Sequence, residues 1–431
     1  MKKPKWFFIL ALLMALSLVA AACADDDDDG DGGDGGDDPA AVCADDEFGC
    51  VEVAEGDPIV MGTLLVITTE NASLGLDSQH GVEVAAALRE TPNEVAGHPI
   101  EFNHQDDLCS PEGGQSGARA LVADKDRLAA VIGTSCSSAA LGVADQILSE
   151  EGIILMSPSN TSPDLATPEN HQDFYFRTAH NDLIQGAAMA QFVSEELGLT
   201  TASTIHDGST YADGLQQAFS DAFTGDYGGE IQAQEAVGVG DKDMKPVLTS
   251  IAAAGPPEFL FFPIFVAEGG LITAQAREIP DLADTDLGGA DGMLTTDWID
   301  AAGAENAAGV YLSGPDLEFE NTFYEDTFLP KYRELFGKPT SVFHAHAFDA
   351  TNIILDAIEA VALTDDEGTT FIPRTALKDE IGATSGYPGV VGELTCDPAT
   401  GDCNPGASMS VSTPNEAGDG FDVVWRQAEA E

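Results

Sequence analysis

Basic residues are scarce in this 431-residue chain, where 17 Lys and Arg stand against 75 Asp and Glu and give a formal net charge of −58. Nucleic-acid binding needs clustered Lys and Arg to contact phosphates, so the composition excludes it. Close contact with anionic lipid headgroups is disfavoured for the same reason. Because the acidic residues are spread along the whole chain, they predict a solvated acidic surface suited to high salt.

Motifs for catalysis and energy coupling are also missing. The sequence has no GxxxxGK[ST] loop for ATP phosphates and no G-x-S-x-G nucleophile elbow. It has no Cys-x-x-Cys pair or Cys/His cluster with zinc spacing, and His344 and His346 would point apart on a helix. We therefore predict a non-enzymatic protein with no cofactor and no metal, and keep an exported hydrolase as the enzymatic alternative.

An uncharged apolar run, residues 6–22, follows Lys2, Lys3 and Lys5 at the amino terminus. It predicts a signal peptide over residues 1–22, because the run is short for a lasting transmembrane helix. The small residues directly before Cys23 resemble a bacterial lipobox, which implies cleavage there and a lipidated Cys23. The alternative is a plain secretory signal. Removing the three Lys changes the formal charge from −58 to −58 − 3 = −61.

Residues 23–56 begin with ADDDDDGDGGDGGDDPA after the cysteine. A segment rich in Gly and like charges, with no core-forming side chains, predicts a disordered, extended tether. The Asp-Gly pattern also suggests a calcium site, but no following Glu or flanking helices complete an EF-hand loop.

The sequence has seven cysteines. Lipidation of Cys23 leaves six, and an exported protein can form disulfides. Four of these form two closely spaced pairs, Cys43 with Cys50 and Cys396 with Cys403, so the remaining pair is Cys109 with Cys136. Six cysteines allow fifteen connectivities, so the pairing is a hypothesis.

From residue 57 the hydrophobic pattern alternates between strands and helices. Strands are expected at 59–68, 99–103, 129–133 and 153–156, with helices at 81–89, 113–125 and 139–150 between them. The same alternation of strands and helices begins again near residue 182, with strands expected at 202–206, 231–237 and 259–264. Two long helices, 321–336 and 344–362, and a terminal β region ending in FDVVWR follow.

The alternation predicts an α/β protein of two Rossmann-like lobes, each a parallel sheet flanked by helices. We expect lobe 1 to comprise residues 57–179 and 314–406, and lobe 2 residues 180–313 and 407–426. The chain would cross near Ala179, Gly314 and Gly406 in a three-segment hinge. Ligands of such sheets bind beyond the carboxyl ends of the strands, where helix N-termini and hydroxyls such as those of Ser137 and Ser138 can hold a carboxylate.

Five stretches in order resemble the substrate-binding lipoproteins of branched-chain amino-acid ABC transporters, which have the type I periplasmic binding fold. They are HQDDLCSPEGG (104–114), VIGTSCSSAA (131–140), GIILMSPSNTSPDL (152–165), IHDGSTYADGL (205–215) and GGADGM (288–293). The resemblance covers about residues 57–426. It also implies a disulfide between Cys109 and Cys136, in agreement with the pairing above.

The resemblance implies where a ligand binds. Ser137 would bind an α-carboxylate, Ser159 and Thr161 would contact the carboxylate and ammonium, and Asp291 would pair with the ammonium. Asn160 would contact the ligand or only set the turn. Tyr211 would close over the ligand from the second lobe, whereas Leu74 and Phe265 stand where the family usually has Tyr.

Each of these residues also has an ordinary structural interpretation. Ser137 and Ser159 are good helix caps, Asp291 is a common turn former, and Tyr211 and Phe265 are typical core side chains. The order of the motifs favours binding over these alternatives.

The predicted function is extracytoplasmic capture of an aliphatic or branched-chain amino acid, with delivery to an ABC permease that has separate ATPase subunits. The protein would contact the membrane only through its lipid anchor. The alternatives are the same fold binding an amide, urea or aromatic acid, or acting as a ligand sensor.

Overall fold

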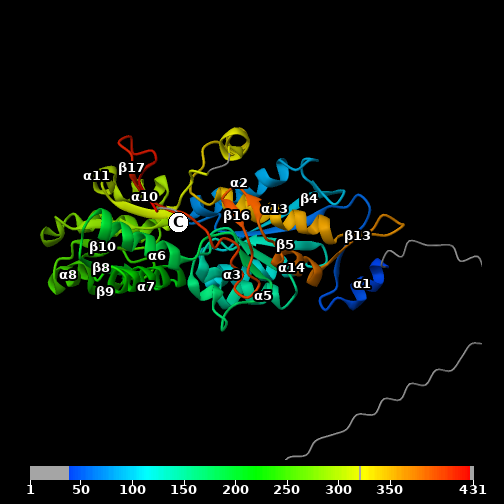
Figure 1. The fold of residues 1–431 in the computed structure, drawn as a ribbon, viewed down its shortest axis with the longest axis horizontal. Coiled ribbons are helices and arrows are strands. Elements are labelled where there is room, and N and C mark those ends of the chain that lie inside the picture. Colours follow the sequence, from blue (N-terminus) through cyan, green and yellow to red (C-terminus); the bar gives the residue numbers. More distant parts are fainter. Residues whose placement is uncertain (1–37, 320–321, 428–431) are drawn as a thin grey trace, which may run out of the picture. The chain divides into compact units, whose positions relative to one another are not determined.

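The computed structural model describes residues 38–319 and 322–427, so the predicted signal peptide and Cys23 lie outside the described residues. The first lobe is built on a six-stranded sheet (Figure 1). Its strands are, in spatial order, β3 (Glu94–Val95), β4 (His98–Asp106), β2 (Ile59–Leu65), β5 (Leu128–Gly133), β6 (Ile154–Ser157) and β7 (Tyr175–Arg177). All neighbouring pairs are parallel except β3 with β4.

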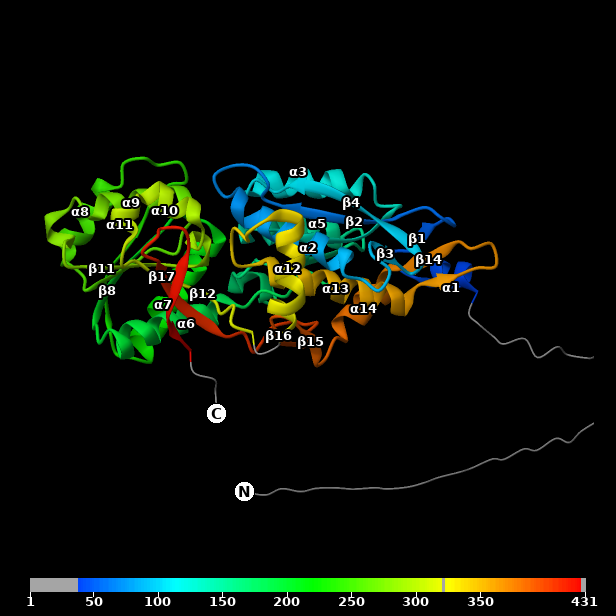
Figure 2. The ribbon, with the colours of Figure 1, turned by 90° about the horizontal axis from the view of Figure 1, so that it is seen from above.

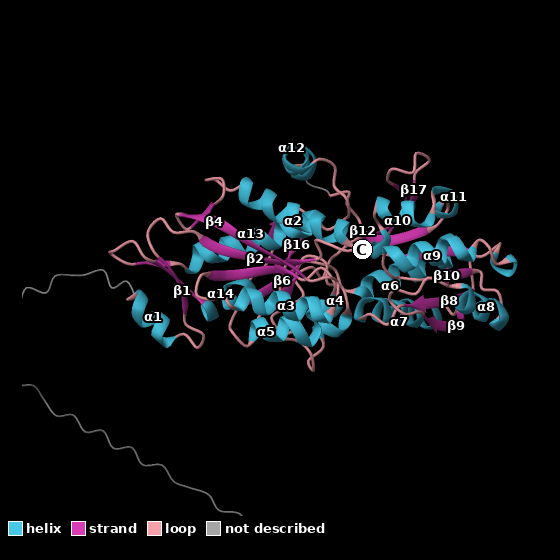
Figure 3. Ribbon diagram, turned by 180° about the vertical axis from the view of Figure 1, so that it is seen from behind, coloured by secondary structure: helices cyan, strands magenta, loops and turns pink. Residues whose placement is uncertain are grey.

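Helices cover both faces of this sheet. They are α2 (Ala72–Ala87), α3 (Pro111–Val122), α4 (Ser137–Ala139), α5 (Asp145–Ser149), α13 (His344–Val361) and α14 (Arg374–Gly382), and α12 (Leu329–Phe336) packs on α2. Helices α13 and α3 lie on opposite sides of the sheet (Figure 3). Alternate residues of β2 pack on these two sides: Ile59 and Met61 pack with residues of α13, whereas Val60 and Leu64 pack with residues of α3 and α5. Burial on both faces explains the nearly continuous apolar sequences of β2, β5 and β6.

The second lobe is built on a seven-stranded sheet. In spatial order its strands are β18 (Phe421–Arg426), β17 (Met409–Pro414), β12 (Tyr311–Pro315), β11 (Asp286–Gly289), β10 (Phe259–Phe261), β8 (Thr201–His206) and β9 (Glu230–Ala236). The strands from β12 to β9 are parallel, and β17 and β18 add antiparallel pairs. The helices are α6 (Asp182–Gln191), α7 (Thr210–Gly225), α8 (Lys245–Ala254), α9 (Val266–Ala276), α10 (Thr296–Ala302) and α11 (Ala304–Ala307).

The chain crosses between the two sheets three times. It leaves the first lobe after β7, returns after β12, and crosses again before β17. Two small sheets complete the first lobe: β1 (Cys50–Val53), β14 (Thr370–Pro373) and β13 (Leu363–Thr364) form one, and β15 (Tyr387–Gly389) pairs with β16 (Gly392–Leu394) in the other. Bending at the crossings stays a prediction.

The prediction of a disordered tether extending to residue 56 is wrong for its last part. Residues Pro39–Asp45 form α1, and β1 pairs with β14 at the end of the first lobe (Figure 2). The Cys43–Cys50 disulfide joins α1 to β1, and Val51 and Val53 are buried. The apolar residues after the Asp-Gly run therefore pack in the core. The acidic, Gly-rich composition of the run gave no indication of this packing.

Four other elements differ from the sequence pattern. Helix α2 begins at Ala72 rather than near residue 81, and β7 and β11 were not predicted as strands. The expected helix 139–150 is interrupted, because Leu141 is extended and Gly142 has a φ of 64°. No helix among the described residues has the length and apolar character needed to span a membrane.

The three predicted disulfides are confirmed: Cys43–Cys50, Cys109–Cys136 and Cys396–Cys403. The second one joins the loop after β4 to the turn after β5. Both turns follow parallel neighbours of β2, so the disulfide stabilises the carboxyl edge of the sheet.

Candidate functional site

A cavity lies between the carboxyl edges of the two sheets. The first lobe contributes Leu74, Ser135, Cys136, Ser137, Ser159 and Phe343 to its wall, and the second lobe contributes Tyr211, Phe265, Asp291 and Gly292. Except for Phe343, which precedes α13, each segment follows a parallel strand, where ligand sites of α/β sheets form.

Six of the eight predicted ligand residues line this cavity: Leu74, Ser137, Ser159, Tyr211, Phe265 and Asp291. Asn160 and Thr161 are fully buried but do not reach the cavity wall. Four residues of the wall were not predicted as ligand residues: Ser135, Cys136, Gly292 and Phe343. Ser135 belongs to the same motif as Ser137, whereas no sequence signal connects Phe343 to a turn some 200 residues earlier.

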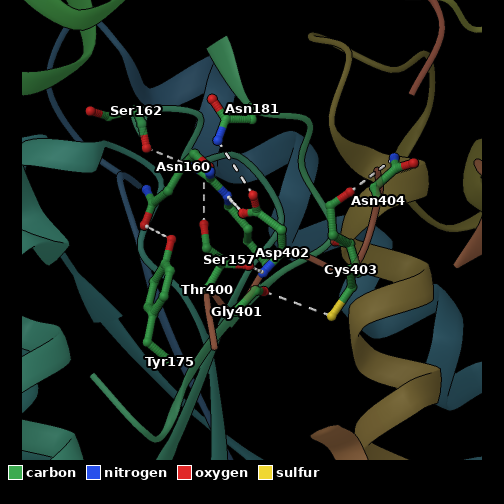
Figure 4. Close-up of polar contacts among 12 residues, drawn as sticks. Ser157, Asn160, Ser162, Tyr175, Asn181, Thr400, Gly401, Asp402, Cys403 and Asn404 are labelled. Carbon is green, nitrogen blue, oxygen red and sulfur yellow. Dashed lines mark hydrogen bonds and ion pairs between the residues drawn. The ribbon is translucent and has the colours of Figure 1, made fainter. Parts of the chain in front are cut away.

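Asn160 stabilises the loop after β6 (Figure 4). Its backbone N–H donates to Ser157 Oγ at 2.9 Å, and its side-chain oxygen accepts from Tyr175 at 3.3 Å. Its carbonyl accepts from the buried Arg177 at 3.1 Å, and Arg177 also pairs with Asp402. These contacts favour the alternative in which Asn160 only sets the turn.

Ser137 offers a hydrogen-bond donor to the cavity. Its hydroxyl oxygen accepts the N–H of Ser162 at 3.3 Å, and no described residue accepts its proton. Ser137 is also the first residue of α4, where N–H groups have no acceptor within the helix. Because α4 has only three residues, this wall provides local donors rather than a helix dipole.

Ser159 differs from Ser137 because its donors are already used. Its N–H donates to Ser157 Oγ at 3.2 Å, and its hydroxyl donates to the Ser135 carbonyl at 3.0 Å. It can therefore present only oxygen lone pairs to a ligand. This restricts the predicted role of Ser159 to accepting from a cationic or N–H group.

Asp107 organises the donor wall from behind. Its carboxylate accepts the N–H of Cys109 at 2.7 Å and that of Ser135 at 2.6 Å, and it is fully buried. Burial raises the pKa of Asp107 to about 7, although the backbone donors oppose the shift. The Asp107 contacts and the Cys109–Cys136 disulfide together fix the turn that carries Ser137.

Asp291 provides a carboxylate on the opposite wall. One of its oxygens, Oδ1, accepts from the Tyr211 hydroxyl at 2.9 Å and from Gln185 Nε2 at 2.8 Å. No described residue donates to the other oxygen. Burial and the Asp291 carboxylate raise the pKa of Tyr211, so its phenol keeps the proton that it donates. The second oxygen of Asp291 is therefore free to bind a cationic group.

A second carboxyl group, Asp182, lies near Asp291. It is fully buried, and neither of its oxygens makes a hydrogen bond of normal geometry. Burial and the charge of Asp291 hold the pKa of Asp182 well above its usual range, and the nearby Thr161 hydroxyl and Arg177 offset only part of the rise. The two neighbouring carboxyl groups therefore differ in their surroundings: Asp291 has two hydrogen-bond donors, whereas Asp182 has none of normal geometry.

Aromatic and aliphatic side chains form the rest of the wall. The Tyr211 and Phe265 rings pack at a centroid distance of 5.1 Å, and Leu74 and Phe343 contribute from the first lobe. The cavity between the walls is small, with a volume of about 10 Å³, which is room for about one water molecule. The lobes must therefore separate to admit a larger molecule.

Direct contacts hold the lobes together around this cavity. The N–H of Thr210 in α7 donates to Ser138 Oγ at 3.0 Å, and the Ser73 hydroxyl donates to Asp297. The structure thus represents a closed arrangement of the two lobes.

The two histidines of the HAHAF segment, His344 and His346, are buried in α13. His344 pairs with Asp77 at 2.8 Å and with the Tyr324 hydroxyl at 2.6 Å, and His346 is buried. Among residues 38–319 and 322–427, no group of His, Cys, Asp and Glu side chains has the arrangement of a metal site.

Comparison with known proteins places this geometry in a family. Residues 58–416 match the family described as periplasmic binding protein. The Leu/Ile/Val-binding protein homolog 3 of Brucella melitensis is 29% identical over 72% of this chain and 80% of its own. The leucine-binding protein LivK of Thermotoga maritima has a TM-score of 0.74 at 24% identity, covering 85% of this chain and 98% of its own.

A third protein, the branched-chain amino-acid transporter substrate-binding protein LivJ of Streptococcus pneumoniae, was solved with isoleucine. Its TM-score is 0.72 at 25% identity, and the match covers 86% of this chain and 100% of that one. The family match extends over both sheets, except for β18, and over every segment of the cavity wall. The chain belongs to the periplasmic binding protein family, whose members are extracytoplasmic solute-binding proteins and not enzymes.

Proposed function

We propose that this protein binds an aliphatic amino acid of the branched-chain type, as a zwitterion, between its two lobes. The observation that carries the proposal is the polarity of the cavity. A free hydroxyl donor, Ser137, lies on one wall, and Asp291, with one oxygen free, lies on the other. The names of the relatives above point to the same ligand class.

A zwitterionic ligand carries two opposite charges, and both would be buried in the cavity. Burying a charge without hydrogen-bond partners is costly, so a bound zwitterion needs donors at its carboxylate and acceptors at its ammonium. Ser137 and Asp291 meet these needs, and Ser159 adds an acceptor. Leu74, Phe265 and the Tyr211 ring would enclose an apolar side chain. Selectivity among Leu, Ile and Val would be modest, because a methylene group is worth roughly 1–3 kcal/mol.

Binding would follow opening and closing at the three crossings, near Ala179, Gly314 and Gly406. A ligand stabilises the closed form only by the difference between its affinities for the closed and open forms. Ser137 on one lobe and Asp291 on the other supply that difference, since a ligand reaches both only when the lobes are closed.

Delivery to an ABC permease with separate ATPase subunits and lipid anchoring through Cys23 complete the proposal. Two acyl chains on one cysteine would suffice for stable attachment, and residues 24–37 would connect the anchor to α1. Detergent phase partitioning of the expressed full chain tests the anchor. The native protein should enter the detergent phase, Cys23→Ser should remain aqueous, and equal partitioning of the two would contradict it.

Isothermal titration with L-leucine, L-isoleucine and L-valine tests the ligand. Matched controls are 4-methylpentanoic acid, which lacks the amine of leucine, and 3-methylbutylamine, which lacks its carboxylate. We expect the amino acids to bind and both controls to be at least tenfold weaker. Asp291→Asn should weaken leucine strongly and 4-methylpentanoic acid little. Equal binding of leucine and the amine-free acid would contradict the proposal.

The tightness of the closed cavity favours one other candidate, a smaller solute such as urea or a short amide. Such a ligand has no ammonium to pair with Asp291. Heat released by acetamide or urea, with all three amino acids inert, would select this candidate.

A further inference from the structure

Gln185 lies in α6, is fully buried and contacts Asp291. Its amide Nε2 donates to Asp291 Oδ1 at 2.8 Å, and contacts the carbonyl and the hydroxyl oxygen of Ser313, each at 3.1 Å. The Gln185 side chain does not line the cavity. Asp291 is the residue of the cavity wall that the Gln185 side chain contacts directly.

The other end of the Gln185 amide contacts His180. His180 Nε2 lies within hydrogen-bond distance of Gln185 Oε1, and the imidazole is fully buried. Carboxylate and carbonyl oxygens only accept, so Nε2 of the amide must face Asp291 and Ser313, and Oε1 must face a donor, His180 Nε2–H. The orientation of the amide is thus determined by its neighbours.

The partners of Gln185 lie on two of the three crossings between the lobes. His180 lies between β7 and α6, where the chain first crosses, and Ser313 lies in β12 two residues before its last strand residue, Pro315, where the chain returns. Asp291 follows β11 in the second lobe. One amide therefore connects the carboxylate of the cavity to two segments that must change conformation if the lobes separate.

We infer that Gln185 is a positioning residue that orients Asp291 for the ammonium group of the ligand and couples this orientation to the crossing segments. The inference rests on the proposed function, because it assigns Asp291 the ammonium. Gln185 leaves Oδ1 of Asp291 fully occupied, together with Tyr211, and so directs Oδ2 to the ligand. Without Gln185, Asp291 would turn or take up water, and closure would no longer depend on its orientation.

The alternative is that Gln185 only satisfies buried polar groups and stabilises the fold. The two roles differ in how Gln185 and Asp291 combine. A positioning role predicts that removing Gln185 matters little once Asp291 is neutral, whereas a structural role predicts independent, additive effects.

The experiment is a double-mutant cycle in L-isoleucine affinity, measured by isothermal titration. It compares the native protein, Gln185→Met, Asp291→Asn and the double variant. Met has a similar length and no donors. Gln191→Met is the matched control, because Gln191 lies in the same helix and, among the described residues, its side-chain amide donates only to Glu195, at 2.9 Å. His180→Phe is a second test, because a phenyl ring keeps the stacking against Phe343 and removes the hydrogen bond to Gln185.

We expect Gln185→Met to weaken isoleucine at least tenfold, His180→Phe to weaken it severalfold and Gln191→Met to leave it unchanged. In the Asp291→Asn background, Gln185→Met should add less than a twofold change. If Gln185→Met does not fold, His180→Phe is measured in the native protein and in the Asp291→Asn variant. A loss of affinity in the native protein that is nearly absent in the Asp291→Asn variant then supports the inference. Native-like affinity of Gln185→Met, or an equal loss of affinity with and without Asp291→Asn, would overturn this inference and leave the proposed function standing. A native protein that binds no aliphatic amino acid would overturn the proposed function and this inference with it.

Discussion

Asp182 and Asp291 are neighbouring buried aspartates with different surroundings. Asp291 receives hydrogen bonds from Tyr211 and Gln185, which stabilise an ionised carboxylate. Asp182 receives none of normal geometry, and burial raises its pKa. Two adjacent buried carboxyl groups do not readily ionise together. Burial and the lack of donors therefore favour the neutral form of Asp182.

Asp182→Asn should be well tolerated, since Asn resembles a protonated Asp in size and charge. An aspartate with a raised folded pKa stabilises most below its unfolded pKa of about 3.9, and that contribution is lost as the pH rises towards the folded pKa. Asn does not ionise, so the Asp182→Asn variant does not lose stability in this way as the pH rises. Thermal unfolding should therefore show the variant gaining stability relative to the native protein between pH 5 and pH 8.

The control for this comparison is Asp221→Asn, a substitution on the exposed side of α7. Its unfolding midpoint should stay at a constant difference from that of the native protein across the same pH range. If Asp182→Asn behaves like this control, Asp182 is ionised in the folded protein and the assignment is wrong.

At the scale of elements, α2 and α13 pack so closely that only glycine fits at one position. A Cβ on Gly81 would lie 2.2 Å from the carbonyl oxygen of His344, at the start of α13. Backbone atoms cannot move aside as a flexible side chain can. This contact positions the N-terminus of α13, and with it Phe343 on the cavity wall.

Gly81→Ala should therefore destabilise the protein by about 1–3 kcal/mol, as overpacking in a core does. Gly225→Ala is the matched substitution, because it also lies in a helix, α7, and a Cβ there meets nothing within 4 Å. It should be neutral or stabilise by up to about 1 kcal/mol, since Ala restricts the unfolded chain. Urea unfolding of both variants measures the difference, and equal stabilities would contradict the packing argument.

Removing the Cys109–Cys136 disulfide by replacing both cysteines with Ser should cost roughly 3–4 kcal/mol on the chain-entropy model. The Cys396–Cys403 disulfide spans only 7 residues, against 27 for the first, so its removal should cost less. Only the first removal should also weaken ligand binding, because Cys136 lines the cavity. Equal ligand affinity in both variants would show that the disulfide does not hold the donor wall.

The sequence predicted the elements with a strong pattern and missed those without one. Strands such as β2 and β5 are continuous apolar runs, and closely spaced cysteines indicated their partners. Strand β11 contains two glycines in four residues, and β7 is three residues long, so neither has a recognisable period. Gln185 and Phe343 could not be found, because their roles depend on contacts across the fold rather than on local pattern.

On the scale of the whole molecule, net charge is the dominant feature. The formal net charge of the chain is −58, so its acidic groups repel one another, and folding brings these groups closer together. Few basic partners are available, since the sequence has only 17 Lys and Arg. Screening by salt weakens this repulsion over distances beyond the Debye length, about 10 Å at 0.1 M.

The thermal unfolding midpoint should therefore rise when NaCl is increased from 0.05 M to 1 M. KCl should produce the same rise, because screening depends on ionic strength and not on the identity of the cation. A midpoint that falls with salt would contradict the account. A rise with one cation only would indicate specific binding instead.

The family resemblance inferred from five short motifs is confirmed by a match that spans both lobes. The ligand and the roles of the cavity residues stay proposals, and they share one claim: Ser137 and Asp291 bind opposite charges of the same molecule. A crystal structure of the mature chain with L-isoleucine tests this most directly. The account predicts the ammonium group within hydrogen-bond distance of Asp291 and the carboxylate at Ser137. Isoleucine bound elsewhere, or with its ammonium group away from Asp291, would contradict it.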